Sequence, residues 1–310
     1  MKIGVIGAGS VGATFAYATL IKGLASEIVL VDINREKAHA EALDLNHGMM
    51  FVPPARVRDG ELADLGGAHV VVITGGAKQK DGQTRLDLAK QNTQILKDVL
   101  PKALEAAPNA LYLVVTNPVD VLTYAALKIS GLPRRQVFGS GTVLDTSRFR
   151  YLLAQHCRVS VRNVHGYIIG EHGDSELPLW SSVTMGGLNL DDYCAVCGRK
   201  CHCGEREVIY RSVRDAAYEI IRAKGATYYA IGLAAAQILE AVSRNDRSIF
   251  TVSTMLEDYY GVSDVCLSVP NVIDSRGVDM TIPVKMTGEE LAAFRRSADV
   301  VRAAIRTVGF

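Results

Sequence analysis

The sequence KIGVIGAGSVG at residues 2–12 decides the fold class. Residues 2–6 form a short apolar run typical of a buried strand, and a helical pattern covers residues 11–22. Between them lies G-x-G-x-x-G, formed by Gly7, Gly9 and Gly12. In this context the glycines allow a tight turn, a close approach of phosphate to the backbone, and close packing of helix on strand. The helix N-terminus adds N–H donors, so the pattern predicts a dinucleotide site.

An acidic residue at the expected distance supports this prediction. Asp32 follows a second apolar run at residues 27–31 and lies twenty positions after Gly12. A carboxylate there accepts hydrogen bonds from ribose hydroxyls and repels a 2′-phosphate, which favours NAD over NADP. Arg35 is close enough in sequence to weaken that repulsion. The cofactor contacts expected from this part of the chain are Gly7, Ala8, Gly9, Ser10, Val11, Gly12 and Asp32.

Composition excludes several classes of protein. The 310 residues include 34 Lys and Arg against 33 Asp and Glu, so no excess positive charge is available for nucleic acid. Hydrophobic residues make up 48% and charged residues 22%, which is ordinary for a folded globular chain. No apolar run is long enough to span a membrane, and glycines interrupt the N-terminal run where a signal peptide would be continuous. We therefore expect a cytoplasmic protein.

The first part of the chain alternates between strand and helix patterns. Further strands are expected at 55–58, 70–73, 111–115 and 136–138, and helices at 35–48, 84–106 and 119–130. Pro101 is expected to kink or break the second of these helices. Apolar strands that alternate with helices predict a parallel sheet covered on both faces. The fold class is therefore α/β, with a doubly wound (Rossmann) domain over residues 1–141.

The second part, residues 142–310, has a different pattern. Helices are expected at 145–156, 205–223, 227–243 and 289–307, and antiparallel strands at 248–252, 265–269 and 278–282. Thr287 and Glu290 form a capping box at the start of the last helix. These elements predict an α+β substrate domain. Because no linker separates it from the first domain, we expect a large interface between the two.

Four of the six cysteines lie close together. Cys194, Cys197, Cys201 and Cys203 surround His202, which suggests either a small zinc site or a loop of reduced thiols. Zinc ligands normally come as two pairs that lie well apart in the sequence. We therefore expect reduced thiols and no bound metal.

Polar side chains that suit hydride-transfer chemistry follow the predicted strands or lie in loops. A loop at 74–85 contains Arg85, Asn117 follows the fifth strand, and His172 lies in a glycine-flanked turn. Asp145 and Arg148 are three apart and share a helix face. Taken alone, each of these residues can be interpreted as an ordinary surface or ion-pair residue. Together they offer a proton donor, an anchor for an anion and a group that polarises a carbonyl.

The motifs GAGSVG, GGAKQKDGQTRLDL, TNPVD, GSGTVLDTSRFR, GEHGDS and KGATYY occur in this order, with Asp32 after the first. In these motifs, and over essentially its whole length, the chain resembles the bacterial L-lactate dehydrogenases of the lactate/malate dehydrogenase family. The resemblance implies reversible hydride transfer between NADH and pyruvate. It assigns proton transfer to His172, with Asp145 orienting its ring, and polarisation of the substrate carbonyl to Arg85. The implied substrate contacts are Arg148, Gln79, Asn117 and Thr227, and the further cofactor contacts are Thr74, Gly75, Gly76, Asn117 and Ile231.

Gln79 separates the alternatives within the family. The malate enzymes carry Arg at this position, which pairs with the second carboxylate of oxaloacetate, so neutral Gln79 favours pyruvate. Malate dehydrogenase and 2-hydroxyisocaproate dehydrogenase activities remain alternatives. A catalytically silent NAD-binding protein is an alternative of another class, because a fold alone does not specify function.

A regulatory site is also implied by the resemblance. In many bacterial lactate dehydrogenases an Arg and a His bind fructose 1,6-bisphosphate across a subunit interface, and the matching residues are Arg150 and His165. A two-fold axis would bring two of each around the two phosphates. The resemblance therefore predicts an allosteric homotetramer.

Overall fold

The computed structural model describes residues 1–77, 85–198 and 203–310, apart from the side chains of Arg85 and Cys203. Helices occupy α1 Ser10–Ile21, α2 Arg35–His47, α3 Arg85–Ala106, α4 Val119–Ser130, α5 Val143–Cys157, α6 Leu190–Cys197, α7 Cys203–Lys224, α8 Tyr229–Arg244 and α9 Gly288–Thr307. The strands of the large sheet are β1 Lys2–Ile6, β2 Glu27–Val31, β3 Arg56–Gly60, β4 Val70–Ile73, β5 Leu111–Val114, β6 Val137–Gly139, β13 Ser253–Met255 and β14 Cys266–Ser268. Smaller sheets contain β7 Val164–His165, β8 Ile168–Ile169, β9 Leu177–Pro178, β10 Thr184–Met185, β11 Leu188–Asn189, β12 Ser248–Phe250, β15 Asn271–Asp274 and β16 Gly277–Thr281.

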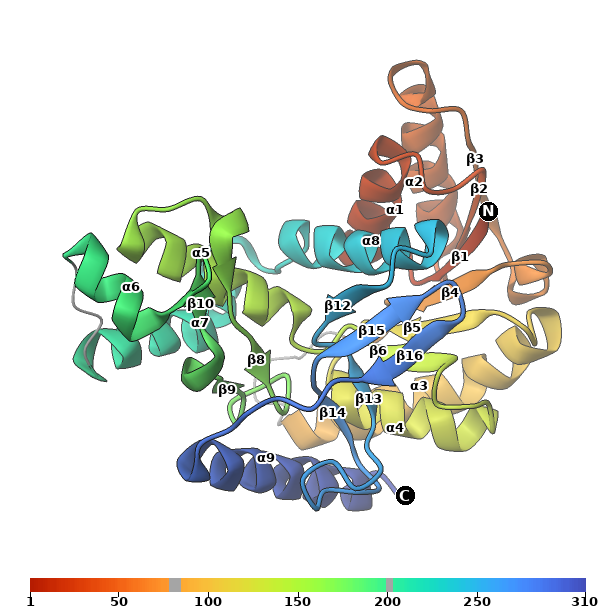
Figure 1. The fold of residues 1–310 in the computed structure, drawn as a ribbon. Coiled ribbons are helices and arrows are strands. Elements are labelled where there is room, and N and C mark those ends of the chain that lie inside the picture. The colour runs from red at the N-terminus through yellow and green to blue at the C-terminus, as the bar shows by residue number, and fades with distance from the viewer. Residues whose placement is uncertain (78–84, 199–202) are drawn as a thin grey trace.

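The large sheet has the doubly wound topology that the sequence predicts. Its strand order is β14-β13-β6-β5-β4-β1-β2-β3, and β1 to β6 are parallel (Figure 1). β4 and β5 are buried throughout, because helices cover both faces of the sheet. The order reverses between β1 and β4, and the carboxyl ends of strands at such a switch point are where ligands bind.

Two strands from the second part of the chain extend this sheet. β13 pairs antiparallel with β6, Ser253 facing Gly139, and β14 pairs antiparallel with β13. The sequence predicts the antiparallel strand at 265–269 but places it in a separate lobe, and it does not predict β13. The sheet therefore crosses the boundary expected between residues 141 and 142, and the division into 1–141 and 142–310 stays a prediction.

Helices α5, α6 and α7 form the lobe on the left of Figure 1 together with β10, and α5 packs there against α7 and β7. Their side chains enclose a core of their own, which includes Phe149, Leu153 and Val213. Helix α6 was not predicted from the sequence. α8 returns from this lobe and packs against α1 of the nucleotide-binding part.

The sequence predicts a kink or a break of α3 at Pro101, and the structure has no break there. α3 continues from Arg85 to Ala106 with Pro101 inside it. Leu100 and Ala103 on either side are buried in the main core, and this packing offsets the loss of one helical hydrogen bond.

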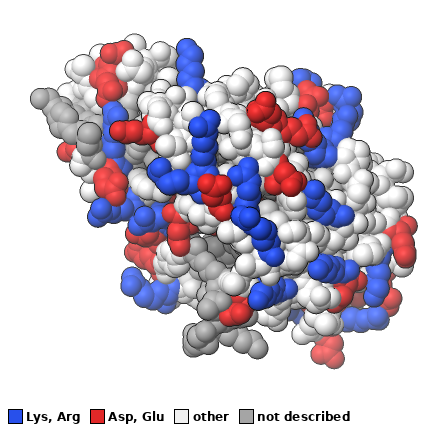
Figure 2. Space-filling model, turned by 90° about the horizontal axis from the view of Figure 1, so that it is seen from below, with Lys and Arg blue, Asp and Glu red and all other residues white. Residues whose placement is uncertain are grey.

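On the face shown in Figure 2, positive and negative side chains are intermixed rather than gathered into a surface of one sign. None of the described helices is long and apolar enough to cross a membrane.

Close contact between α1 and α8 depends on Gly232. A Cβ atom on Gly232 would lie 2.6 Å from Cγ2 of Thr14 and 3.1 Å from its carbonyl carbon. We expect Gly232→Ala to destabilise the protein by about 1–3 kcal/mol, since overpacking outweighs the better helix propensity of alanine. Thermal unfolding followed by circular dichroism measures this. Gly204→Ala in α7 is the control, because a Cβ atom there meets nothing within 4 Å; equal losses in both variants would contradict the packing argument.

Candidate active site

The turn after β1 fits a dinucleotide phosphate. Gly7 has a φ of 105°, and a Cβ atom on it would lie 2.3 Å from the backbone nitrogen of Gly75. A Cβ atom on Gly12 would lie 2.0 Å from the carbonyl oxygen of Gly7. By contrast, space is open above Gly9, which is the N-cap of α1 and leaves the first-turn N–H groups without a side-chain cap. Such N–H groups bind an anion.

Asp32 lies beside this turn with its carboxylate held by the backbone. Oδ2 accepts from the Ala8 N–H at 2.7 Å, and Oδ1 accepts from the Asn34 N–H at 2.9 Å. Each oxygen keeps a lone pair for a ribose hydroxyl. Arg35, which the sequence analysis names as able to weaken the repulsion of a 2′-phosphate, pairs with exposed Glu61 at 2.6 Å.

The ends of β4 and β5 are fastened to each other and to the glycine turn. Thr74 Oγ1 donates to the Gly7 carbonyl at 2.7 Å. Asn92, buried in α3, accepts from the Ala77 N–H and donates to the Asn117 carbonyl, both at 2.7 Å. The structure thus brings the expected contacts Thr74, Gly75, Gly76 and Asn117 to one edge of the sheet. The sequence interpretation missed Asn92, whose polar side chain in a helix had no motif to mark it.

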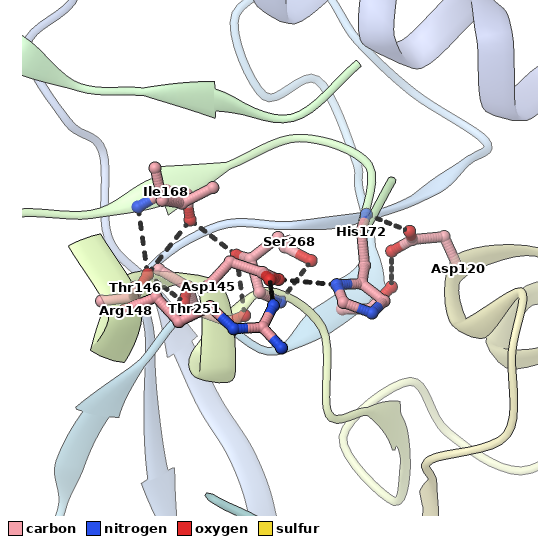
Figure 3. A network of polar contacts seen from close by, with 10 residues as sticks. Asp120, Asp145, Thr146, Arg148, Ile168, His172, Thr251 and Ser268 are labelled. Atoms are coloured by element: carbon pink, nitrogen blue, oxygen red, sulfur yellow. Dashed lines mark hydrogen bonds and ion pairs between the residues drawn. The ribbon is translucent and has the colours of Figure 1, made fainter. Parts of the chain in front are cut away.

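The central cluster joins α5 to the turn after β8. Nδ1 of His172 lies 2.6 Å from Oδ2 of Asp145, and Arg148 Nη1 donates to Oδ1 of the same carboxylate at 2.7 Å (Figure 3). The Asp145 side chain is 3% exposed, Arg148 15% and His172 24%. The sequence placed these three side chains together by motif, and the structure confirms that they meet.

Electrostatics keep both members of the His172–Asp145 pair ionised. Burial alone would raise the pKa of Asp145, but His172 and Arg148 outweigh burial and hold that pKa below its usual value. Burial likewise opposes a charge on the imidazole, yet Asp145, with smaller contributions from Glu176 and Asp120, raises the pKa of His172 to about 9. At neutral pH His172 therefore carries the proton that a general acid needs.

Asp120 positions the backbone of His172 and was not singled out from the sequence. Its Oδ2 accepts from the His172 N–H at 2.7 Å, and its Oδ1 accepts from Ser253 Oγ at 2.6 Å (Figure 3). Burial raises the pKa of Asp120 to about 7. A carboxylate in the otherwise apolar start of α4, two residues after Pro118, was the available signal.

Hydroxyl groups fasten the other side of the cluster. Thr142 Oγ1 donates to the Ile168 carbonyl at 2.6 Å, and the Ile168 N–H donates to Thr146 Oγ1 at 3.0 Å (Figure 3). Thr146 and Thr251 share a hydrogen bond at 3.0 Å. These bonds fix α5 against β8, which leads into the His172 turn.

The remaining predicted residues are distributed as follows. Thr227 is half-buried between α7 and α8, and Ile231 packs from α8 against the core. Gln79, Cys201 and His202 lie outside the described residues, as do the side chains of Arg85 and Cys203. Cys194 is buried and Cys197 partly so. The expectation of reduced thiols without metal stays a prediction.

Arg150 and His165 lie on neighbouring segments. Arg150 Nε donates to the Gly166 carbonyl at 3.0 Å, and its guanidinium carbon lies 5.3 Å from the centroid of the Tyr167 ring. Burial lowers the pKa of Arg150. His165 is exposed on β7.

Nearly the whole chain is similar to known lactate/malate dehydrogenases. Residues 1–139 match the NAD-binding domain of the lactate/malate dehydrogenases, and residues 142–309 match their alpha/beta C-terminal domain. A curated L-lactate dehydrogenase of Thermoanaerobacter sp. (strain X514) is 51% identical over 305 residues, 98% of either chain. Another, from Acetivibrio thermocellus, is 50% identical over 307 residues, 99% of this chain and 97% of the relative.

The fold also matches solved structures of lactate dehydrogenases. A lactate dehydrogenase from a Medee basin deep-sea metagenome library matches with a TM-score of 0.96 and 40% identity, covering 100% of this chain and 99% of that one. The minor L-lactate dehydrogenase of Enterococcus mundtii gives the same TM-score and identity, covering 99% and 98%.

The doubly wound sheet, the glycine turn and Asp32 define an NAD-binding protein, and the family matches make it an NAD-dependent oxidoreductase. More narrowly, the chain belongs to the lactate/malate dehydrogenase family, which confirms the resemblance seen in its motifs.

Proposed function

We propose that the protein is an L-lactate dehydrogenase that reduces pyruvate to L-lactate with NADH and catalyses the reverse reaction. The observation that carries this proposal is the cluster in which one buried carboxylate, Asp145, contacts both His172 and Arg148. The names of the relatives and the neutral Gln79 support pyruvate as the substrate. The complete cluster argues against a silent NAD-binding protein.

In the proposed reaction, NADH supplies a hydride to the carbonyl carbon. The Nδ1 atom of His172 faces Asp145, so its Nε2 atom delivers the proton to the carbonyl oxygen. Asp145 holds the ring and stabilises its charged form. The reverse reaction returns the proton to neutral His172.

Arg148 is the proposed anchor for the substrate carboxylate. Its Nη1 atom already bonds to Asp145, which fixes the guanidinium plane. The other N–H groups remain for the carboxylate of the substrate. By resemblance, Arg85 polarises the carbonyl, Asn117 lies between nicotinamide and substrate, and Thr227 and Ile231 line the pocket.

Replacing the proton donor tests the proposed reaction. We expect His172→Asn to lower kcat for pyruvate reduction by about 10²- to 10⁴-fold, because no general acid remains. Fluorescence titration should show NADH affinity changed by less than about threefold, since His172 lies outside the glycine turn. In the unmodified enzyme, pyruvate reduction should fall as pH rises through about 9, where His172 loses its proton. Near-native turnover of the variant would refute the proposed chemistry.

Gln79 is the proposed reason that pyruvate is preferred over oxaloacetate. Gln79→Arg supplies a partner for the second carboxylate, so we expect the ratio of kcat/KM for oxaloacetate to that for pyruvate to rise at least about tenfold. Steady-state kinetics with both substrates measure it. Gln94→Arg, the same change at an exposed position of α3, should leave the ratio unchanged. A branched 2-oxo acid as a third substrate tests the alternative activity, because a 2-hydroxyisocaproate dehydrogenase would prefer it to pyruvate.

Assembly and regulation form the last part of the proposal. Exposed apolar side chains gather on the packed pair α1 and α8: Tyr17 57%, Ile21 53%, Tyr229 65% and Leu233 56% exposed. Such a surface supports an interface between subunits, and the family resemblance implies a homotetramer. Arg150 donates to the Gly166 carbonyl, and His165 is the residue before Gly166. Their closeness supports a fructose 1,6-bisphosphate site, which the family resemblance places where subunits meet.

Saturation curves for pyruvate test the effector. We expect fructose 1,6-bisphosphate to lower the half-saturating pyruvate concentration about fivefold or more, because a ligand that prefers the active state shifts the population towards it. Arg150→Gln should remove the effect, whereas Arg162→Gln at a nearby exposed position should keep it. Identical curves with and without the bisphosphate would exclude this regulation.

A further inference from the structure

Glu176 has an unusual position for an acidic residue. It is 4% exposed, and its buried Oε1 atom has no hydrogen-bond partner among the described residues. The other buried acids in the described part of the chain have side-chain partners: Asp120 with Ser253, Asp145 with His172 and Arg148, Glu240 with Lys22, and Asp274 with Arg276. A buried polar atom without a partner is costly, so its location calls for an explanation.

The carboxyl group of Glu176 belongs to the central cluster. One oxygen of Glu176, one oxygen of Asp145 and one ring nitrogen of His172 all lie within 4.8 Å of one another. The backbone of Glu176 is fixed on both sides, because its N–H donates to the Gly173 carbonyl and its carbonyl accepts from the Tyr210 hydroxyl of α7. The side chain is therefore held against the proton donor and its partner.

The surrounding charges decide the ionisation of Glu176. Burial and the nearby charge of Asp145 raise the pKa of Glu176 well above its usual value. His172 of the same turn, Arg148 of α5 and Arg214 of α7 oppose this effect without cancelling it. Asp145 already has two partners, so as the pH falls Glu176 takes up a proton before Asp145 does.

The short distance between Glu176 and His172 also affects the pKa of His172. Asp145 has the largest favourable effect on the imidazolium, and Glu176 and then Asp120, from α4, add to it. A charge on Glu176 stabilises the imidazolium only while Glu176 is ionised. The proton on His172 therefore depends on whether Glu176 carries one.

We propose that Glu176 is a positioning residue for the proton of His172: its carboxyl group is buried beside the imidazole, and when it is ionised it strengthens the hold of His172 on its proton. The inference rests on the proposed function of His172. Loss of a proton from one member of the pair makes loss from the other harder, which extends pyruvate reduction to more alkaline pH. The same coupling delays lactate oxidation, which needs neutral His172.

The test compares Glu176→Gln with the unmodified enzyme. A neutral amide keeps the size of the side chain and removes its charge, so the effect of that charge on His172 is lost at every pH. In the pH profiles of kcat/KM, the alkaline limb for pyruvate and the acidic limb for lactate should both move to lower pH. The expected shift is about 0.5–2 pH units, because one charge ~5 Å from the imidazole is lost. Both limbs move together because both report the same imidazole.

A binding measurement gives a readout that does not depend on turnover. Oxamate is an unreactive amide analogue of pyruvate, and under the proposed function its carbonyl oxygen would accept a hydrogen bond from protonated His172. Its affinity for the NADH complex should fall at a lower pH in Glu176→Gln than in the unmodified enzyme. Glu207→Gln removes the same charge from an exposed site on α7 and should leave all three profiles unchanged.

The outcomes separate this inference from the proposed function. Unshifted limbs in Glu176→Gln, or equal shifts in Glu207→Gln, would overturn it even if His172→Asn is inactive. A loss of more than about 100-fold that is equal at every pH, in a folded Glu176→Gln protein, would also overturn it, because the side chain would then act by something other than its effect on the proton of His172. Glu176→Asp, which keeps an acid, should return the limbs towards their original positions. An active His172→Asn variant would instead refute the proposed function.

Discussion

The carboxylate of Asp145 is the constraint on which the site depends. A charge that is 3% exposed must have partners, since an unpaired buried charge costs several kcal/mol. Asp145 has two, His172 and Arg148, and the positive charge of each opposes the effect of burial. Burial of one acid therefore fixes the proton of a general acid and the orientation of an anion-binding guanidinium at the same time.

Holding that carboxylate in place requires contacts from both halves of the chain. Asp120 in α4 accepts from the backbone of His172 and from Ser253 in β13. Thr142 and Thr146 at the start of α5 bind Ile168 in β8. Because these bonds connect α4, α5, β8 and β13, the relative position of His172 and Arg148 is set by the fold and not by a flexible loop.

The sequence predicts what depends on local patterns. The strands β1 to β6, the glycine turn and Asp32 follow from apolar runs and fixed spacing, and the meeting of His172 with Asp145 follows from resemblance. Asn92, Asp120 and Glu176 could not be predicted in this way, because each acts through partners far away in the sequence. β13 and β14 were missed as parts of the large sheet for the same reason: three-residue strands carry little pattern, and their pairing is decided by tertiary contacts.

The antiparallel addition of β13 to β6 has a further consequence. β6 is buried along its length, and without β13 its outer backbone groups would be exposed on an apolar edge strand, a template for aggregation. A fragment that stops after residue 141 would end in such an edge, although it contains the whole glycine turn. The nucleotide-binding half therefore needs a strand that follows β6 by more than a hundred residues to complete its sheet, and we expect the two halves to unfold together.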